Sequence, residues 1–370
     1  MKCFPGRIRQ VQLLCYPLAL LLLCTGQRTA AALDTNRPDV RRFIARVAKQ
    51  DSFSKRRLRE LLAAAQTQPA IIEAMDRRAE HVKLWFEYRA IFVNEKRIQE
   101  GADFWIAHRG ELARASASSG VAPEYIVAIL GVETSYGRST GRYRVLDALA
   151  TLAFDYPSRA KFFQDELEAF LLLTREASID PLAATGSYAG AMGAPQFMPS
   201  NYRRYAVDAA GDGHIDLWTN WLDVFASVGN YFREHGWIPG EPVLSEASNG
   251  PDADVATTLD GRSLSMVETV GSLQGKGIHF ETMQPATAPA VLIAADDADR
   301  VHWRIGYHNF YVITRYNHSM LYAMAVHDLA QMIRGRVAVM DAIPAPVVAP
   351  APDLVPFPLP GATAAMGAPP

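Results

Sequence analysis

Cysteine is nearly absent from this sequence of 370 residues. The three cysteines, Cys3, Cys15 and Cys24, all lie close to the N-terminus. The rest of the chain therefore contains no disulfide, no thiolate metal site and no cysteine nucleophile. A strong excess of charge is absent too, because 37 Lys and Arg stand against 39 Asp and Glu, for a net charge of −2. This balance excludes a strongly basic nucleic-acid binder.

Several common catalytic motifs are also missing. The sequence has neither a His-Glu-x-x-His zinc motif nor a Gly-x-Ser-x-Gly nucleophile motif. No Gly-Lys-Ser/Thr follows the glycines at 186–193, and no strand pattern precedes them, so they do not form a phosphate-binding loop. Nucleotide binding and hydrolysis by zinc or serine are therefore not supported.

The N-terminus carries the pattern of an export signal. Basic residues precede an apolar run at 11–23, and the alanines at 30–32 resemble a cleavage site. The run is short for a membrane span, although an uncleaved anchor is the alternative. Lipid attachment at Cys24 is a second alternative, but the bulky Leu23 before it fits such a site poorly. We expect residues 1–32 to be a cleaved signal peptide and the mature protein to be periplasmic.

The remaining composition, 49% hydrophobic and 21% charged, is typical of a globular protein with two or three domains. Residue spacing predicts mostly helices, one β-rich insertion, and a Pro/Ala-rich tail that is disordered. The expected domains are a helical domain at 33–115, a core at 116–240, a small β-rich domain at 241–309, a helical return at 310–342 and the tail at 343–370. Expected helices are Asp39–Ala48, Lys55–Ala65, Asn94–Ser116 and Met320–Arg334, and expected strands are Val255–Leu259, Ala290–Ala294 and His302–Ile305.

One further helix, from Pro123 to Gly137, carries a candidate catalytic acid. Ile126, Ile129, Leu130 and Glu133 recur at helical spacing and so share one face. A carboxyl group at the end of an apolar stripe can be held protonated by desolvation and act as a general acid. The alternative is a glutamate that turns to solvent at the helix end. Glu124, in the first turn, is expected at the surface, where the helix dipole favours it.

Five segments together resemble one enzyme family. They are Val-Glu-Thr-Ser-Tyr-Gly at 132–137, Gly-Ser-Tyr-Ala-Gly-Ala-Met-Gly at 186–193, Gln-Phe-Met-Pro-Ser at 196–200, Asp-Gly-His-Ile-Asp-Leu-Trp at 212–218 and Thr-Arg-Tyr-Asn at 314–317. Across roughly 35–335 the chain resembles the membrane-bound lytic transglycosylase B family, glycoside hydrolase family 103. The resemblance implies a mainly α fold, in which a lysozyme-like helical core is joined by an additional helical domain and a small β-rich domain.

The resemblance also implies a reaction. The substrate is the glycan strand of peptidoglycan, cut between N-acetylmuramic acid and N-acetylglucosamine, and the product is a 1,6-anhydromuramic end. Glu133 is the catalytic residue, first as acid and then as base, and the substrate's N-acetyl group takes the place of a second carboxylate. No cofactor takes part in catalysis.

Family positions that line the cleft are predicted to bind the glycan through aromatic faces, amides and hydroxyls. For each tyrosine, a core position with a hydrogen-bonded hydroxyl is the alternative. For the arginine, the alternatives are a solvated charge and a partner for an anionic substrate group. These positions are Tyr88, Arg159, Ser187, Gln196, Phe197, Tyr231, Tyr316 and Tyr322.

An acidic loop resembles the start of an EF-hand. Asp208, Asp212, the carbonyl of His214 and the later Asp223 are the candidate calcium ligands. Ala210 stands where a ligand oxygen is expected, so we expect a weak, structural calcium site. The alternative is an acidic turn capped by its own side chains.

Two other functions compete with a periplasmic lytic transglycosylase. A hydrolytic muramidase on the same core would need a positioned water and usually a second carboxylate, which the motifs do not provide. A catalytically inert peptidoglycan-binding scaffold would not need Glu133. Expected partners are glycan strands and other cell-wall enzymes, with no nucleic acid, and the protein is expected to be a monomer.

Overall fold

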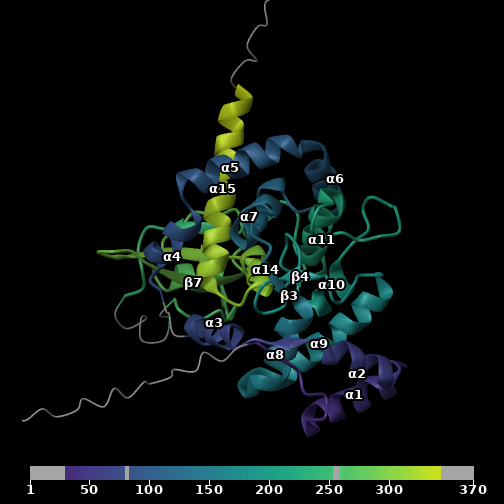
Figure 1. Cartoon of the computed structure of the whole chain (residues 1–370). Coiled ribbons are helices and arrows are strands. Elements are labelled where there is room, and N and C mark those ends of the chain that lie inside the picture. Colours follow the sequence, from purple (N-terminus) through teal and green to yellow (C-terminus); the bar gives the residue numbers. More distant parts are fainter. Residues whose placement is uncertain (1–29, 80–82, 253–258, 260, 343–370) are drawn as a thin grey trace, which may run out of the picture. The chain divides into compact units, whose positions relative to one another are not determined.

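The computed structural model describes residues 30–79, 83–252, 259 and 261–342. The chain divides into two compact units, each built from two separate stretches. The first unit comprises the described residues up to 79 together with 142–190, and the second comprises 83–141 and those from 191 onward. Both units contain helices, and the longer strands belong to the second (Figure 1). The sequence alone predicted domains that follow one another along the chain, and did not predict two units that each combine separate stretches.

The first unit is built around helix α8. Ten of the eleven residues of α8 are buried, because its sequence, Val-Leu-Asp-Ala-Leu-Ala-Thr-Leu-Ala-Phe-Asp, is apolar on nearly every face. Helix α9 packs along it, and α3 and β2 contact it as well. The elements are β1 (Ala31–Ala32), α1 (Pro38–Gln50), α2 (Lys55–Ala63), β2 (Gln66–Thr67), α3 (Pro69–Ala79), β3 (Tyr143–Arg144), α8 (Val145–Asp155), a 3-10 turn (Pro157–Arg159), α9 (Ala160–Glu176) and β4 (Thr185–Gly186).

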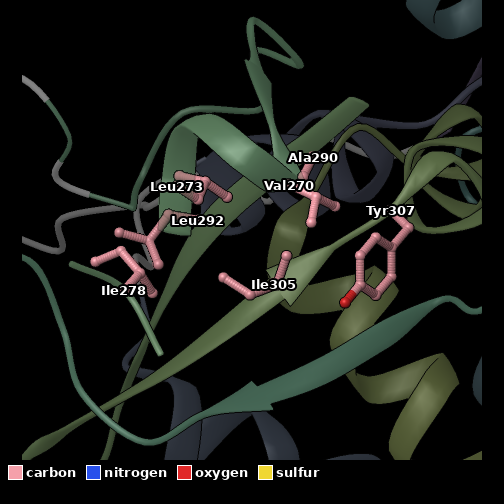
Figure 2. Packing of buried hydrophobic residues seen from close by; sticks show 7 residues of the cluster. All are labelled: Val270, Leu273, Ile278, Ala290, Leu292, Ile305 and Tyr307. Carbon is pink, nitrogen blue, oxygen red and sulfur yellow. The ribbon is translucent and has the colours of Figure 1, made fainter. Parts of the chain in front are cut away.

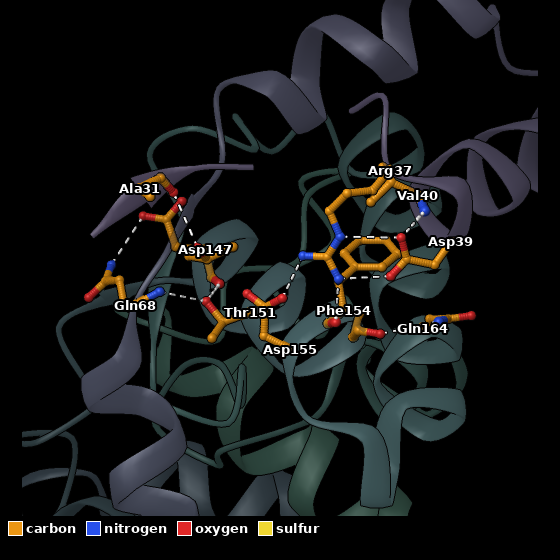
Figure 3. A network of polar contacts seen from close by, with 12 residues as sticks. Ala31, Arg37, Asp39, Val40, Gln68, Asp147, Thr151, Phe154, Asp155 and Gln164 are labelled. Carbon is orange, nitrogen blue, oxygen red and sulfur yellow. Dashed lines mark hydrogen bonds and ion pairs between the residues drawn. The ribbon is translucent and has the colours of Figure 1, made fainter. Parts of the chain in front are cut away.

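Polar side chains tie the N-terminal stretch of this unit to α8 (Figure 3). The guanidinium of Arg37 pairs with Asp155 at 2.6 Å and with Asp39 at 2.8 Å. Asp147, buried in α8, accepts a hydrogen bond from the backbone N–H of Gln66 at 2.9 Å. The contact with Gln66 satisfies the buried charge of Asp147, which would otherwise oppose folding.

The second unit is built around helix α7 (Pro123–Thr134). Its residues are almost all buried, and α5, α6, α11 and α15 contact it. A helix that is apolar on every face requires such complete coverage. The other helices are α4 (Trp85–Phe92), α5 (Glu95–Ala107), α6 (Arg109–Ser119), α10 (Pro199–Tyr205), α11 (Trp221–Glu234), α13 (Val270–Gly275), α14 (His308–Tyr316) and α15 (Met320–Ala342).

A four-stranded antiparallel sheet belongs to the second unit, in the order β5-β8-β7-β6. Its strands are β5 (Leu244–Ala247), β6 (Glu268–Thr269), β7 (Pro289–Asp296) and β8 (Val301–Gly306). Alternate residues of β7 and β8, including Leu292 and Ile305, pack against α13 and form a separate small core (Figure 2). The predicted strands Ala290–Ala294 and His302–Ile305 are confirmed.

Other predicted elements meet mixed outcomes. Asp39–Ala48, Lys55–Ala65 and Met320–Arg334 are helical over most of their lengths, and the last continues to Ala342. The single helix expected at Asn94–Ser116 is wrong, because α5 ends at Ala107 and α6 begins at Arg109, with His108 between them outside helical geometry.

Some predictions fall outside the described residues. These are most of the signal peptide, most of the strand expected at Val255–Leu259, and the tail at 343–370. Within the described parts, no single helix combines the length and apolarity needed to cross a bilayer, although α6 and α7 pass that test together as a pair bent by 111°.

Candidate active site

Glu133 lies in the last turn of α7 and is partly exposed, whereas its helix is buried. The helix was predicted to end at Gly137, but it ends at Thr134. Ser135 and Tyr136 already adopt left-handed backbone angles, with φ of 52° and 62°. Such angles are costly outside glycine and persist only when neighbouring contacts hold them. Neighbouring contacts therefore hold the end of α7 in this conformation.

The contacts that hold this helix end come from three directions. The Thr134 hydroxyl donates to the carbonyl of Ala194 at 2.8 Å and accepts from the backbone N–H of Gly137 at 3.0 Å. The Tyr136 hydroxyl donates to the carbonyl of Arg97 at 2.6 Å. The Arg97 guanidinium in turn donates to the carbonyl of Gly131. Sequence reasoning missed these roles; Thr134 and Tyr136 lie inside the quoted motif, but nothing in the sequence marks Arg97.

Tyr322 contacts Glu133 directly. Its hydroxyl donates to Oε1 of Glu133 at 2.7 Å, and its ring is buried at the start of α15. Burial, followed by the nearby Glu133, raises the pKa of Tyr322 well above its ordinary value of 10. Tyr322 therefore remains a neutral phenol, which orients the Glu133 carboxyl by hydrogen bonding.

An aromatic cluster lies behind Tyr322. Tyr316 stacks on Tyr322 with ring centroids 6.5 Å apart, and Phe197 and Tyr231 pack on Tyr316 at 5.9 and 4.8 Å. The hydroxyl of Tyr316 donates to the carbonyl of Pro195, and that of Tyr231 to the carbonyl of Arg315, both at 2.6 Å. Phe197 and Tyr231 are thus buried, whereas Tyr316 is partly buried with its hydroxyl hydrogen-bonded, close to the alternative given for the tyrosines.

Two more of the predicted site residues, Tyr88 and Gln196, belong to the second unit. Tyr88 on α4 is only partly buried and lies near enough to Tyr322 to raise its pKa further. Gln196 has a φ of 53°, and its amide nitrogen donates to the carbonyls of Gly193 and Thr140 at 2.9 and 3.0 Å. The Gln196 side chain therefore fixes the turn that follows Gly193.

Arg159 and Ser187 belong to the first unit. The guanidinium of Arg159 lies 4.5 Å from the ring centroid of Phe162, a cation–π contact. The Ser187 hydroxyl accepts from the backbone N–H of Ala189 at 3.3 Å. Their approach to the glycan stays a prediction.

The acidic loop is organised by its own backbone. Asp208 accepts from the N–H groups of Gly211 and Gly213 at 2.6 and 2.8 Å, and Asp212 accepts from that of His214 at 2.9 Å. Asp223 is fully buried and accepts from the N–H groups at 209, 210 and 216. Backbone bonds also lower the pKa of Asp208.

In the arrangement described, backbone N–H groups engage the carboxylates of the predicted calcium ligands. Among the described residues, no group of three or more His, Cys, Asp or Glu side chains is placed to hold a metal ion. The geometry agrees with the alternative, an acidic turn capped by its own side chains.

Glu124 corrects another expectation. It was predicted at the surface, but it is 6% exposed at the start of α7. Residues of α15 and of the segment 237–244 surround Glu124 and cover the first turn of α7. Helical periodicity could not reveal this cover, because it comes from elements distant in the sequence.

Residues 35–331 match the model of the transglycosylase SLT domain. This match spans most of the chain. The chain belongs to the transglycosylase SLT domain family. One curated protein with a similar sequence is membrane-bound lytic murein transglycosylase B of Escherichia coli strain K12. It is 41% identical over 310 residues, which cover 80% of this chain and 83% of the relative.

Solved structures of SLT domain proteins resemble this one over nearly their full lengths. SltB1 of Pseudomonas aeruginosa, a soluble lytic transglycosylase, is 45% identical, with a TM-score of 0.75 over 81% of this chain and 99% of that one. Slt35 of Escherichia coli, a lytic transglycosylase solved with bulgecin A, is 39% identical, with a TM-score of 0.74 over 85% and 98%. A further structure of Slt35 contains calcium. The expected mainly α, lysozyme-like fold is confirmed.

Proposed function

We propose that this SLT domain protein cleaves murein glycan strands with Glu133 as its one catalytic carboxyl. The chain is a lytic transglycosylase, as its family and relatives show. The observation that carries the assignment of Glu133 is its hydrogen bond with the buried, neutral Tyr322 at 2.7 Å. This contact gives one carboxyl a fixed orientation at the end of a rigid, buried helix.

Such a carboxyl can perform both proton transfers of the reaction. Protonated Glu133 first donates its proton to the glycosidic oxygen as the bond from that oxygen to C1 of muramic acid breaks. The carbonyl oxygen of the substrate's N-acetyl group stabilises C1 during this step. Glu133, now a carboxylate, takes the proton of the 6-hydroxyl as O6 bonds to C1. The 1,6-anhydro product forms without consuming water, and Glu133 is protonated again.

The surrounding residues support this cycle in two ways. Tyr322 holds Oε1 of Glu133, so the carboxyl does not rotate between the two transfers. Tyr88 of the second unit is partly exposed and lies near Tyr322, and we assign it a stacking contact with a sugar ring. Arg159 and Ser187, in the first unit, stay predicted glycan-binding residues.

We further propose export to the periplasm, since murein lies outside the cytoplasm. The pattern at 1–32 supports this location. Leu33, the first residue after this pattern, is buried in the fold, and Ala31–Ala32, at the end of the pattern, pair with Gln66–Thr67 in the full chain. N-terminal mass analysis of the mature protein tests the proposal. A start near Leu33 supports a cleaved signal, whereas a lipid on Cys24 indicates an outer-membrane lipoprotein.

Calcium and protein partners remain at the level of prediction. The Slt35 structure that contains calcium supports calcium binding by this chain, and we place it at the acidic loop, although the carboxylates there are engaged by backbone N–H groups. Any binding is therefore expected to be weak and structural, with no part in proton transfer. Association with other cell-wall enzymes and a monomeric state are also proposed.

Digestion of purified murein sacculi tests the proposed reaction. Soluble muropeptides carrying 1,6-anhydromuramic ends support it. Reducing ends indicate a hydrolytic muramidase, and the absence of any product together with retained binding indicates an inert scaffold.

A further inference from the structure

A second cavity lies in the second unit, at the other end of the catalytic helix. It has a volume of about 340 Å³ and is lined by the first turn of α7, one face of α15 and the segment 237–244. Glu124 in its wall and Glu133 are nine positions apart on α7. This spacing separates them by about 13 Å along the axis and places them on opposite sides of the helix. The cavity is therefore distinct from the active site.

Glu124 is a buried residue whose carboxylate accepts no hydrogen bond from the described residues. Its side chain is only 8% exposed, and its charged partner, the guanidinium of Arg334, is 3.7 Å away. Among the described residues, no N–H or O–H group donates a hydrogen bond to it. Buried carboxylates are normally hydrogen-bonded. Because Glu124 lines the cavity, a donor on a ligand there would satisfy it.

Polar side chains linked by hydrogen bonds line the cavity on the side of α15. Gln331 donates to the hydroxyl of Tyr125 at 3.2 Å, and that hydroxyl contacts Nδ1 of His327 at 3.0 Å. Burial lowers the pKa of His327 to about 4, so its ring is neutral. In the tautomer in which the Tyr125 hydroxyl donates to Nδ1, the proton of His327 lies on Nε2. The wall thus offers an N–H donor from His327.

Trp237 supplies an aromatic wall. Its ring packs on Phe232 at 5.4 Å and on Tyr125 at 5.1 Å. Its indole Nε1 is buried without a hydrogen-bond partner in the described structure. The cavity therefore combines aromatic surface with a carboxylate acceptor and a neutral donor.

We propose that this cavity is a secondary binding site for one uncharged N-acetylhexosamine unit. Sugar hydroxyls would donate to Glu124 and accept from Nε2 of His327, while a ring face packs on Trp237 or Tyr125. Anions are disfavoured by Glu124, and a simple cation would leave the His327 donor unused. The volume is near the lower end of the roughly 300–1,000 Å³ typical of ligand sites.

The choice of a sugar rests on the proposed function, since a glycan strand supplies such units. A secondary site would retain the strand while Glu133 acts elsewhere on it. Binding to the cavity, however, can be measured without any cleavage. The two proposals can therefore fail separately.

The probe is N,N′-diacetylchitobiose, added to the full chain carrying Glu133→Gln to prevent turnover. The indole N–H resonance of Trp237, assigned with Trp237→Phe, reports on this cavity specifically. We expect the resonance to shift saturably with the probe. Adding Glu124→Gln should weaken the apparent affinity about tenfold, the effect of losing one hydrogen bond to a charged group. Glu60→Gln, an exposed carboxylate on α2, is the matched control and should change nothing.

A second variant guards against misfolding. Ala122 lines the cavity just before α7, and Ala122→Phe should fill the space and abolish the shift while Glu124 is retained. A Trp237 resonance that does not move up to the solubility limit of the probe would overturn the proposal. Equal affinities for the Glu124→Gln and Glu60→Gln proteins would also overturn it. Murein cleavage by the unmodified protein, measured in parallel, reports on the proposed function alone.

Discussion

Replacing Tyr322 by phenylalanine isolates the contact that orients Glu133, the proposed catalytic carboxyl. The change removes one hydroxyl, which donates to Oε1 of Glu133 at 2.7 Å, and keeps the buried ring that stacks on Tyr316. A buried hydrogen bond to a charged group contributes about 1.5–3 kcal/mol. If this energy is expressed in the transition state, turnover falls by about 10- to 150-fold.

The same substitution should alter the pH profile. The phenol hydrogen-bonds to the carboxylate form of Glu133, so its loss disfavours that form relative to the acid. The midpoint of the pH–activity profile that reflects ionisation of Glu133 should therefore lie at higher pH in the Tyr322→Phe enzyme. Initial rates of muropeptide release from sacculi, measured across pH at several substrate concentrations, would show both effects.

Tyr202→Phe is the matched control. Tyr202 is equally buried, and its hydroxyl donates to the carbonyl of Ile215 at 2.6 Å without touching Glu133. Its loss should cost about 0.5–1.5 kcal/mol of stability and leave turnover and its pH profile unchanged. Equal turnover and equal profiles for the Tyr322→Phe and Tyr202→Phe enzymes would refute the positioning role of Tyr322.

Three further predictions test neighbouring parts of the account. Glu133→Gln should lower turnover by about 10²–10⁴-fold while glycan binding and thermal stability persist; half of normal turnover would remove Glu133 from the mechanism. Thr134→Val leaves the carbonyl of Ala194 without its hydrogen-bond donor and should lower kcat with little change in KM. Thr134→Ser keeps the hydroxyl and should retain the normal kcat. Equal defects in the two variants would contradict the hydrogen-bonding role. With a dissociation constant of about 10⁻⁴–10⁻³ M, 1 mM calcium should stabilise the fold against unfolding by only about 0.4–1.4 kcal/mol relative to chelator. Asp212→Asn should remove that gain, and saturation at micromolar calcium would contradict the weak site.

The catalytic helix illustrates what sequence patterns can predict. Pro123 and the apolar spacing that follows it correctly predict where α7 begins and that Glu133 lies on it. They place its end three residues too late, because Ser135 and Tyr136 adopt angles that only the surrounding contacts enforce. A local pattern holds no information about Arg97, which contacts this end from another helix.

Burial was harder to predict than helicity. Glu124 was expected in solvent because a first-turn acid is favoured there, yet α15 covers it from 200 residues further along the chain. Phe197 and Tyr231 were predicted from family positions, but their burial emerged only from the structure. The family resemblance thus identified residues around Glu133, while tertiary contacts decided which of them are buried.

The chemical form of the muramic acid end tests the central claim most directly. Sacculi digested by the purified protein should release muropeptides that are lighter by one water than hydrolytic products, because O6 of muramic acid attacks C1 once Glu133 has protonated the leaving oxygen. Mass spectrometry distinguishes the two forms. A preponderance of 1,6-anhydro ends is the predicted result, and a preponderance of reducing ends would contradict a single carboxyl acting first as acid and then as base.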